Sequence, residues 1–236
     1  MTPAYRIRRR RNARRITLKV LPDRSVEVVA PPGLSERAIA SMVEDRCDWI
    51  AAARARLLQQ QQARAPELDD PFPTRIELPA IENTLIVHYD DSARRNRLDW
   101  SNRQLTIAGP RDAAQTARAL IQALKTIAQH ALEPQLHQLA GAHGYTLERV
   151  GWRNQKSRWG SCRRMRRGVG RLSLNIRLLL LPPASARSVL LHELAHIDHP
   201  NHSPAFWQRV EVIDPNYRQH QQVIKAATLE LPIWIV

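Results

Sequence analysis

The sequence predicts an α+β fold, in which a helix with the pattern His-Glu-x-x-His lies beside a mixed sheet. Three observations lead to this prediction. Short segments with strand-like alternation recur along the chain, and longer segments place an apolar residue every three or four positions, as helices do. The His-Glu-x-x-His pattern stands in good helix-forming sequence at residues 188–196. The chain has 236 residues, enough for one large domain or two small ones.

The composition is that of a globular protein with a strong positive charge. Hydrophobic residues make up 43% and charged residues 25% of the chain, which is ordinary for a globular domain. The formal net charge is +14 and the isoelectric point about 11.1. Such a balance favours acidic partners, namely nucleic acid, anionic surfaces or acidic proteins, although an arginine-rich proteome produces the same balance.

Cysteine usage and hydropathy give an expectation for the compartment. Cys47 and Cys162 are too few for a disulfide framework and are not spaced as metal ligands. A reduced compartment follows as the simpler interpretation. The basic N-terminus lacks the apolar stretch of a secretory signal, and no apolar run is long enough to span a bilayer. We therefore expect a cytoplasmic protein without a membrane partner.

The front of the chain predicts a small basic hairpin. Residues 6–15 contain seven arginines and no acid. Residues 16–21 alternate as a strand does, residues 22–25 suit a turn, and residues 26–30 form a second strand.

A helix follows this hairpin. Ser35 suits the N-cap position, and apolar residues continue at helical spacing towards Leu58. The glutamine-rich stretch 59–66 has low complexity and is typical of a fraying end or linker. We therefore predict a basic front region at residues 1–66 and a main region at residues 67–236.

The main region begins with a β-rich part and a long helix. Four strand-like segments with turn residues between them are Ile76–Leu78, Leu85–Tyr89, Arg97–Trp100 and Gln104–Ile107. Residues 112–140 keep an apolar face over a long helical segment, in which Pro134 predicts a bend or a division into two helices. Gly141 and Gly144 are expected to end this helix.

A second strand pair precedes the histidine pattern. The run 152–162 and the strand 171–176 are joined by a tip rich in arginine and glycine at residues 163–168. Their position predicts a sheet lying over a cleft beside the histidine pattern, with an edge that could pair with an extended peptide. A core hairpin with a solvated turn fits the same residues.

The histidine pattern has the geometry of a metal site. On a helix, positions i and i+4 lie on one face, so His192 and His196 can aim ring nitrogens at one ion. Glu193 lies roughly 100° around the helix from His192, where it can act as a general base without being a ligand.

Local signals favour His202 as the third ligand. Pro200 disfavours helical geometry before it, and Ser203-Pro204 is typical of the start of a new helix. His202 then lies in a short reversal that returns to the ion. Three protein ligands and one open position are the arrangement of a catalytic zinc site. His199 is the competing third ligand, and Asp198 is better suited to supporting a ligand histidine.

Two short helical segments are predicted after the metal ligands. Phe206, Trp207, Val210 and Ile213 form a buried helix face, and Asp214-Pro215 suits the start of another helix. On that helix, Tyr217 or His220 could stabilise an oxyanion, whereas packing for Tyr217 and a surface position for His220 are the simpler alternatives.

Five segments form a recognisable pattern in chain order: Lys156–Cys162, Leu174–Leu178, His192–His196, Asn201–Trp207 and Pro215–Tyr217. With this pattern the chain resembles the YgjP-like metallopeptidase family, which is similar to the SprT-like zinc proteases. The resemblance covers nearly the whole chain and implies a zincin-like α+β domain. It also implies one zinc ion bound by His192, His196 and His202, with Glu193 as catalytic acid/base. The metzincins share the histidine spacing, but their glycine before the third ligand is His199 here.

The sequence therefore predicts a zinc-dependent peptidase acting on protein or peptide substrates. One alternative is a nucleic-acid-binding protein whose metal site is structural or degenerate, and another is a metal-dependent hydrolase of non-peptide amides. Residues 6–19 and 153–171 carry many cations and no acid, which predicts sequence-independent binding of nucleic acid.

Overall fold

A computed structural model describes residues 3–21, 24–62 and 66–236 of the chain. The chain divides into two compact units, Met1–Arg64 and Ala65–Val236. Of the stretch 59–66, predicted as a fraying end or linker, residues 59–62 are helical and Pro66 begins a 3-10 segment, while residues 63–65 lie outside the described residues. Residues 22 and 23 of the predicted turn at residues 22–25 also lie outside them. A division of roles between residues 1–66 and 67–236 stays a prediction.

The first unit contains a three-stranded sheet. Its strands are β1 (Tyr5–Arg9), β2 (Thr17–Val20) and β3 (Val26–Ala30), in the order β1-β3-β2. β2 and β3 pair antiparallel, as expected for the predicted hairpin, and β1 adds a parallel strand on the other side of β3. The sequence analysis did not predict β1, because its arginines hide the alternation of the half-buried Tyr5 and Ile7 with exposed Arg6 and Arg8.

Two helices cover this small sheet where one was predicted. They are α1 (Glu36–Glu44) and α2 (Cys47–Gln62), separated by a short break. The Ser35 hydroxyl accepts a hydrogen bond from the Ala38 backbone N–H, as its N-cap position requires. Ile39, Val43 and Ile50 are all buried against the sheet, so the apolar periodicity continues across the break. This continuity explains why the sequence pattern suggests a single helix.

The second unit begins with a four-stranded sheet. Its strands are β4 (Arg75–Leu78), β5 (Asn83–Asp90), β6 (Arg97–Asp99) and β7 (Gln104–Ala108), in the order β4-β5-β7-β6. β5 and β7 are parallel, and the outer strands pair antiparallel with them. Leu85 and Val87 on β5 and Leu105 and Ile107 on β7 are buried in the main core.

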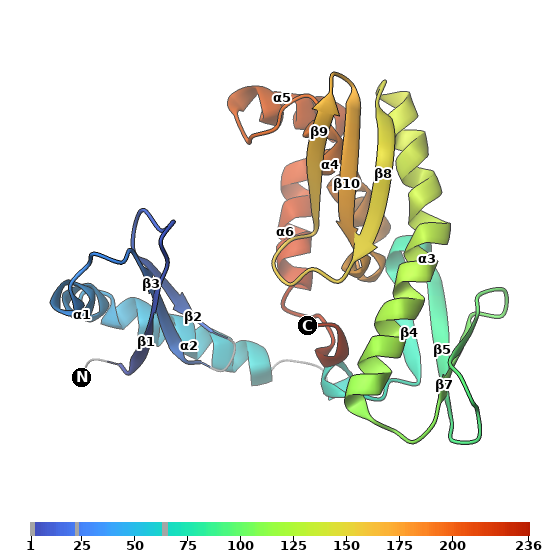
Figure 1. The fold of residues 1–236 in the computed structure, drawn as a ribbon, viewed down its shortest axis with the longest axis horizontal. Helices are drawn as coiled ribbons and strands as arrows, with labels where there is room; N and C mark the ends of the chain where they lie inside the picture. Colours follow the sequence, from blue (N-terminus) through green and yellow to red (C-terminus); the bar gives the residue numbers. More distant parts are fainter. Residues whose placement is uncertain (1–2, 22–23, 63–65) are drawn as a thin grey trace. The chain divides into compact units, whose positions relative to one another are not determined.

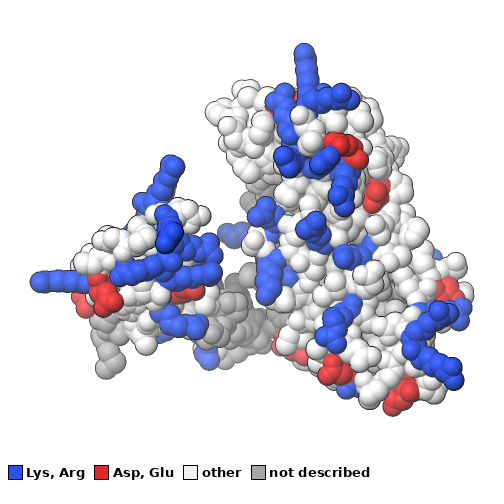
Figure 2. All heavy atoms as spheres, in the orientation of Figure 1, with Lys and Arg blue, Asp and Glu red and all other residues white. Residues whose placement is uncertain are grey.

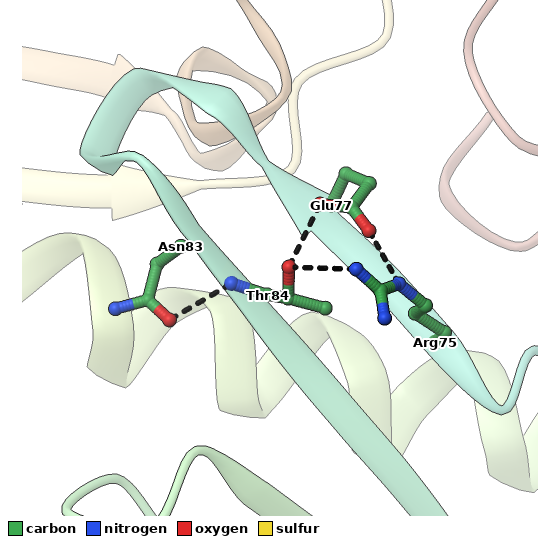
Figure 3. Close-up of polar contacts among 4 residues, drawn as sticks. All are labelled: Arg75, Glu77, Asn83 and Thr84. Carbon is green, nitrogen blue, oxygen red and sulfur yellow. Dashed lines mark hydrogen bonds and ion pairs between the residues drawn. The ribbon is translucent and has the colours of Figure 1, made fainter.

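A polar cluster lies on the solvent-facing side of the β4–β5 hairpin (Figure 3). Arg75 forms an ion pair with Glu77 at 2.6 Å, and the Thr84 hydroxyl donates to the other oxygen of Glu77 at 2.8 Å. These hydrogen bonds lower the pKa of Glu77. Glu77 and Thr84 lie directly opposite each other on the two strands, so the contact favours the observed register. Arg75 and Glu77 are exposed, so the contribution of their ion pair to stability is small.

The helix α3 (Ala113–Ala142) connects the two sheets of this unit (Figure 1). The Asp112 carboxylate caps it by accepting a hydrogen bond from the Gln115 backbone N–H at 2.7 Å. Pro134 lies inside the helix and does not divide it. Gly144 follows the helix with a φ of 75°, in the left-handed region that glycine adopts without strain. α3 packs against both β7 and β8 and so fixes the second sheet on the first.

The second sheet of this unit lies beside the histidine pattern. Its strands are β8 (Thr146–Arg153), β9 (Gly160–Arg166) and β10 (Val169–Asn175), in the order β8-β10-β9. β8 is parallel and β9 antiparallel to β10, so the sheet is mixed and β9 is an edge strand. Trp152, Leu172 and Leu174 point into the core on the face that α3 and α4 cover.

The remaining helices surround this face of the sheet. They are α4 (Pro183–Ala195), α5 (Pro204–Ile213) and α6 (Tyr217–Ala227), and short 3-10 segments occur at Pro66–Asp69, Pro79–Ile81, Ile176–Leu180 and Ile233–Ile235. α4 packs against β9, α5 and α6. The predicted buried face of α5 is observed at Phe206, Val210 and Ile213. Over the described part of the chain, no helix combines the length and apolar character needed to cross a membrane.

Candidate metal centre

Three histidines converge at the end of α4. His192 lies in the last turn of this helix, His196 is its C-cap, and His202 lies just before α5. Ligand nitrogens from all three lie within 4.8 Å of one another. The Nε2 atoms of His192 and His202 are 3.1 Å apart. Two nitrogens bound to a tetrahedral zinc at its usual bond length lie about 3.3–3.4 Å apart, so this donor set fits such an ion.

Hydrogen bonding and burial prepare the rings to bind a metal. Nδ1 of His196 lies 3.0 Å from the backbone carbonyl of His199, which can only accept, so Nδ1 carries the proton and Nε2 is free. Burial, together with the neighbouring imidazoles of His196 and His202, lowers the pKa of His192 to about 4. Burial also lowers the pKa of His196. Neutral imidazole is the form that binds metals, so these rings are in the required state near neutral pH.

The helix α5 supplies aromatic rings that hold the histidines in place. Phe206 is fully buried, and its ring stacks on His196 with a centroid distance of 4.4 Å. The same ring meets His192 and His202 edge-on, with centroid distances of 4.9 and 4.8 Å. Trp207 stacks on His202 at 5.5 Å. The Ser203 hydroxyl accepts a hydrogen bond from the Phe206 backbone N–H and caps α5. The local sequence therefore determines where the helix that carries these rings begins.

Glu193 is a buried carboxylate in the same cleft. Its side chain packs against Gly160 on β9 so closely that an added Cβ atom at Gly160 would lie 2.6–2.7 Å from it. Within the described residues, its Oε2 atom is buried and has no hydrogen-bond partner. Burial raises the pKa of Glu193 to about 7, against a smaller opposite effect of the Arg158 charge. A buried carboxyl oxygen without a partner is costly unless a ligand uses it.

The three histidines and Glu193 line one cleft of about 420 Å³. The lining also includes Gly160 to Cys162 of the edge strand β9, together with Val210 of α5 and Tyr217 and Ile224 of α6. The cleft thus combines a strand edge with apolar side chains. This is an arrangement for an extended ligand with apolar side chains.

Asn175 holds the loop that leads into β9. Its side-chain amide donates to the backbone carbonyls of Gln155 and Arg158, each at 2.8 Å, and its backbone N–H donates to the Trp159 carbonyl at 2.9 Å. Gly160 follows directly, so these bonds determine where the strand meets Glu193. The sequence analysis gave Asn175 no role in the site. An asparagine directly after Leu174, at the end of β10, was the available signal.

The segment after the second histidine is held by a second polar group. The Tyr145 hydroxyl donates to the Asp198 carboxylate at 2.6 Å, and Nε of Arg209 donates to the same hydroxyl at 3.1 Å. Asp198, expected to support a ligand histidine, is thus held by Tyr145, and the support of His196 comes from the His199 carbonyl.

Of the two residues considered for an oxyanion, the structure places only Tyr217 in the lining of the cleft. It is buried, and its ring stacks on Trp207 with a centroid distance of 5.4 Å. Nδ1 of His220 lies 3.2 Å from the buried Asp214 carboxylate, which forms an ion pair when the ring is protonated. The geometry therefore favours Tyr217 over His220 for contact with a ligand.

Three converging imidazoles beside a buried carboxylate define a class of metal-binding α+β proteins. Within this class, residues 14–227 match the family described as YgjP-like, metallopeptidase domain, and the chain belongs to that family. Comparison of the chain with curated proteins and with solved structures gave no match. The predicted family resemblance is therefore confirmed over most of the chain, and the family indicates a metal-dependent hydrolase of the peptidase type.

Proposed function

We propose that the protein is a zinc-dependent peptidase with a zincin-like catalytic domain. His192, His196 and His202 bind the metal, and Glu193 is the general base. The observation that carries the proposal is the buried Oε2 of Glu193, which has no partner among the described residues and lies in the same cleft as the three histidines. Three neutral nitrogen donors suit several transition metals, and three protein ligands with an open position are typical of catalytic zinc.

The metal ion and the side chains of the protein would have different roles in the reaction. Bound zinc would polarise a carbonyl and lower the pKa of a water molecule towards neutrality. Glu193 takes the proton of the attacking water and passes it to the leaving nitrogen. The Tyr217 hydroxyl is the donor available for the oxyanion that develops on the substrate carbonyl. The apolar walls of the cleft exclude water and strengthen these interactions.

The substrate is proposed to be an extended peptide that pairs with the free edge of β9. β9 pairs with β10 on one side only, so its other edge presents backbone N–H and C=O groups to the cleft. A strand added there places its scissile carbonyl next to the histidines, and alternate side chains reach the apolar wall. An unstructured protein segment meets this requirement without unfolding.

Two alternatives make different demands on Glu193. A nucleic-acid-binding protein with a structural metal site needs no acid beside its ligands, and its buried carboxylate would be an unexplained cost. A hydrolase of non-peptide amides shares the metal chemistry but does not need a strand edge. Cleavage of an unstructured protein separates the peptidase from both. A cytoplasmic setting stays a prediction, in agreement with the free thiols of Cys47 and Cys162.

The test is the substitution Glu193→Gln, which keeps the size of the side chain and removes the base. We expect the variant to retain one zinc per chain, measured by mass spectrometry of the metal, and to lose cleavage of an unstructured protein by about 10²–10⁴-fold or more. Glu148→Gln is the matched control, because Glu148 is an exposed carboxylate outside the cleft. Wild-type activity of Glu193→Gln would exclude the mechanism, and loss of zinc would make Glu193 a ligand or a structural residue.

A further inference from the structure

The outer face of the β8-β10-β9 sheet carries a row of arginines. Arg149 on β8, Arg171 on β10 and Arg163 on β9 lie directly opposite one another across the three strands. Like charges at directly opposite positions destabilise a sheet unless counter-charges are near. An irregularity in the β8–β10 register brings Glu148 beside this row, where it forms an ion pair with Arg171 at 2.5 Å. For Arg149 and Arg163, no carboxylate of the described residues lies within ion-pair distance.

A groove of about 240 Å³ lies beside this row. Its middle is formed by the neighbouring cross-strand row, Gly151, Ser173 and Ser161, whose side chains are absent or short. A Cβ atom at Gly151 would meet nothing closer than 4.0 Å, so the groove is open above this glycine. Arg153 closes the groove on the side away from the arginine row. The result is a concave strip of hydroxyl groups between guanidinium groups.

We propose that this face binds the phosphodiester backbone of a nucleic acid, without reading its sequence. Guanidinium groups match phosphate in bidentate geometry, and serine hydroxyls are common partners of phosphate oxygens. Figure 2 shows basic side chains spread over this face of the sheet, with few acidic groups among them. An acidic protein would need apolar or aromatic anchors at the centre of the interface, and the groove lining contains no aromatic residue.

The nucleic-acid site is distinct from the metal centre. β9 separates the two, because Ser161 and Cys162 line both the cleft and the groove while the histidines line the cleft alone. The site involves only some of the basic residues that the sequence contains. Of the cations in residues 153–171, the groove is lined by Arg153, Arg163 and Arg171, and Arg149 is added from β8. Arg158 instead lines the metal cleft, and Arg164 donates to the Asp198 carbonyl. Binding at this face needs no metal, so the site does not depend on the proposed peptidase activity.

The test is the salt dependence of binding, measured by fluorescence anisotropy with the full chain and labelled DNA duplex, single-stranded DNA and RNA of random sequence. The double variant Arg149→Ala/Arg163→Ala leaves the Arg171–Glu148 pair intact. Two lost phosphate contacts are expected to reduce the slope of log K against log salt by about 1.8 on duplex DNA and about 1.4 on single strands, between about 50 and 200 mM salt. Comparison of the three probes shows which kind of nucleic acid the face binds most tightly.

The control is Arg94→Ala/Arg95→Ala, which removes the same charge from exposed positions between β5 and β6. It should keep the slope to within a small fraction of that change. Arg149→Lys/Arg163→Lys should also keep the slope, because both positive charges remain. Circular dichroism and metal content establish that each variant is folded. The proposal is overturned if the two alanine variants lose the same slope. It is equally overturned if only a poly-glutamate probe, and no nucleic acid, loses affinity with the face variant, because the face would then belong to an acidic protein.

Discussion

Gly160→Ala tests whether catalysis depends on the contact between β9 and Glu193. The added Cβ atom would lie 2.6 Å from Cγ, 2.7 Å from Cδ and 2.7 Å from Oε1 of Glu193, all below the closest approach of real Cβ atoms. The strand has little freedom to move away, because the Trp159 carbonyl accepts a 2.9 Å hydrogen bond from Asn175 and Gly160 pairs with Leu174. The side chain of Glu193, only 6% exposed, must therefore turn out of its position.

The expected cost can be stated for stability and for activity. Overpacking a well-packed site costs about 1–3 kcal/mol, which lowers Tm by roughly 2–4 °C for each kcal/mol in a chain of this size. Displacing the general base should lower kcat by about 10²–10⁴-fold, while the three histidines keep the metal. The assay is cleavage of an unstructured protein, with metal content measured on the same sample.

Gly151→Ala is the matched control for this substitution. Gly151 is in the same sheet, and a Cβ atom there would meet only the Leu172 carbonyl at 4.0 Å. Activity and Tm of this variant should remain close to those of the wild type. If Gly160→Ala keeps full kcat with metal bound, Glu193 does not act from the position that the structure shows, and the proposed role of the β9 contact is wrong.

Three further predictions test the site. His202→Ala should abolish stoichiometric zinc while His199→Ala leaves it nearly intact, and the reverse metal contents would move the third ligand to His199. Tyr217→Phe should lower kcat by about 10²–10³-fold with little change in KM, whereas an unchanged kcat would limit Tyr217 to packing. Burial raises the pKa of the Cys162 thiol to about 12, so at pH 8 it stays protonated. Iodoacetamide should then label Cys162 slowly in the folded protein and quickly in urea, as followed by mass spectrometry.

The histidine cluster was predictable because its geometry is local. Helix geometry places His192 and His196 one turn apart on one face, and Pro200 and Ser203 mark the break that lets His202 return. The helix nevertheless ends at Ala195, earlier than the expected end near His199, and a turn continues from there. Such small errors at helix ends do not change which side chains meet.

The contacts that the sequence did not predict join residues far apart in the chain. Gly160 packs against Glu193, and the Asn175 side chain donates a hydrogen bond to the backbone carbonyl of Gln155. No periodicity or spacing relates these positions, because they depend on how the sheet and α4 pack together. Within the first unit, the strand β1 was missed for a different reason. There the alternation was present in the sequence, but the arginines among the strand residues obscured it.

The position of His202 depends on hydrogen bonds among Tyr145, Asp198 and Arg209, none of which is a histidine of the cluster. α4 ends before His202, so the intervening turn must be held if the ring is to meet the other two. Asp198 in that turn accepts a hydrogen bond from Tyr145, which directly precedes β8, and Tyr145 accepts one from Arg209 on α5. One phenol thereby connects the turn, the sheet and the helix that carries Phe206.

Burial and the Asp198 carboxylate raise the pKa of Tyr145, so its hydroxyl keeps the proton that it donates. Hydrogen bonds to charged groups contribute about 1.5–3 kcal/mol each, which is enough to order a short turn. These contacts hold the turn that brings His202 beside His192 and His196.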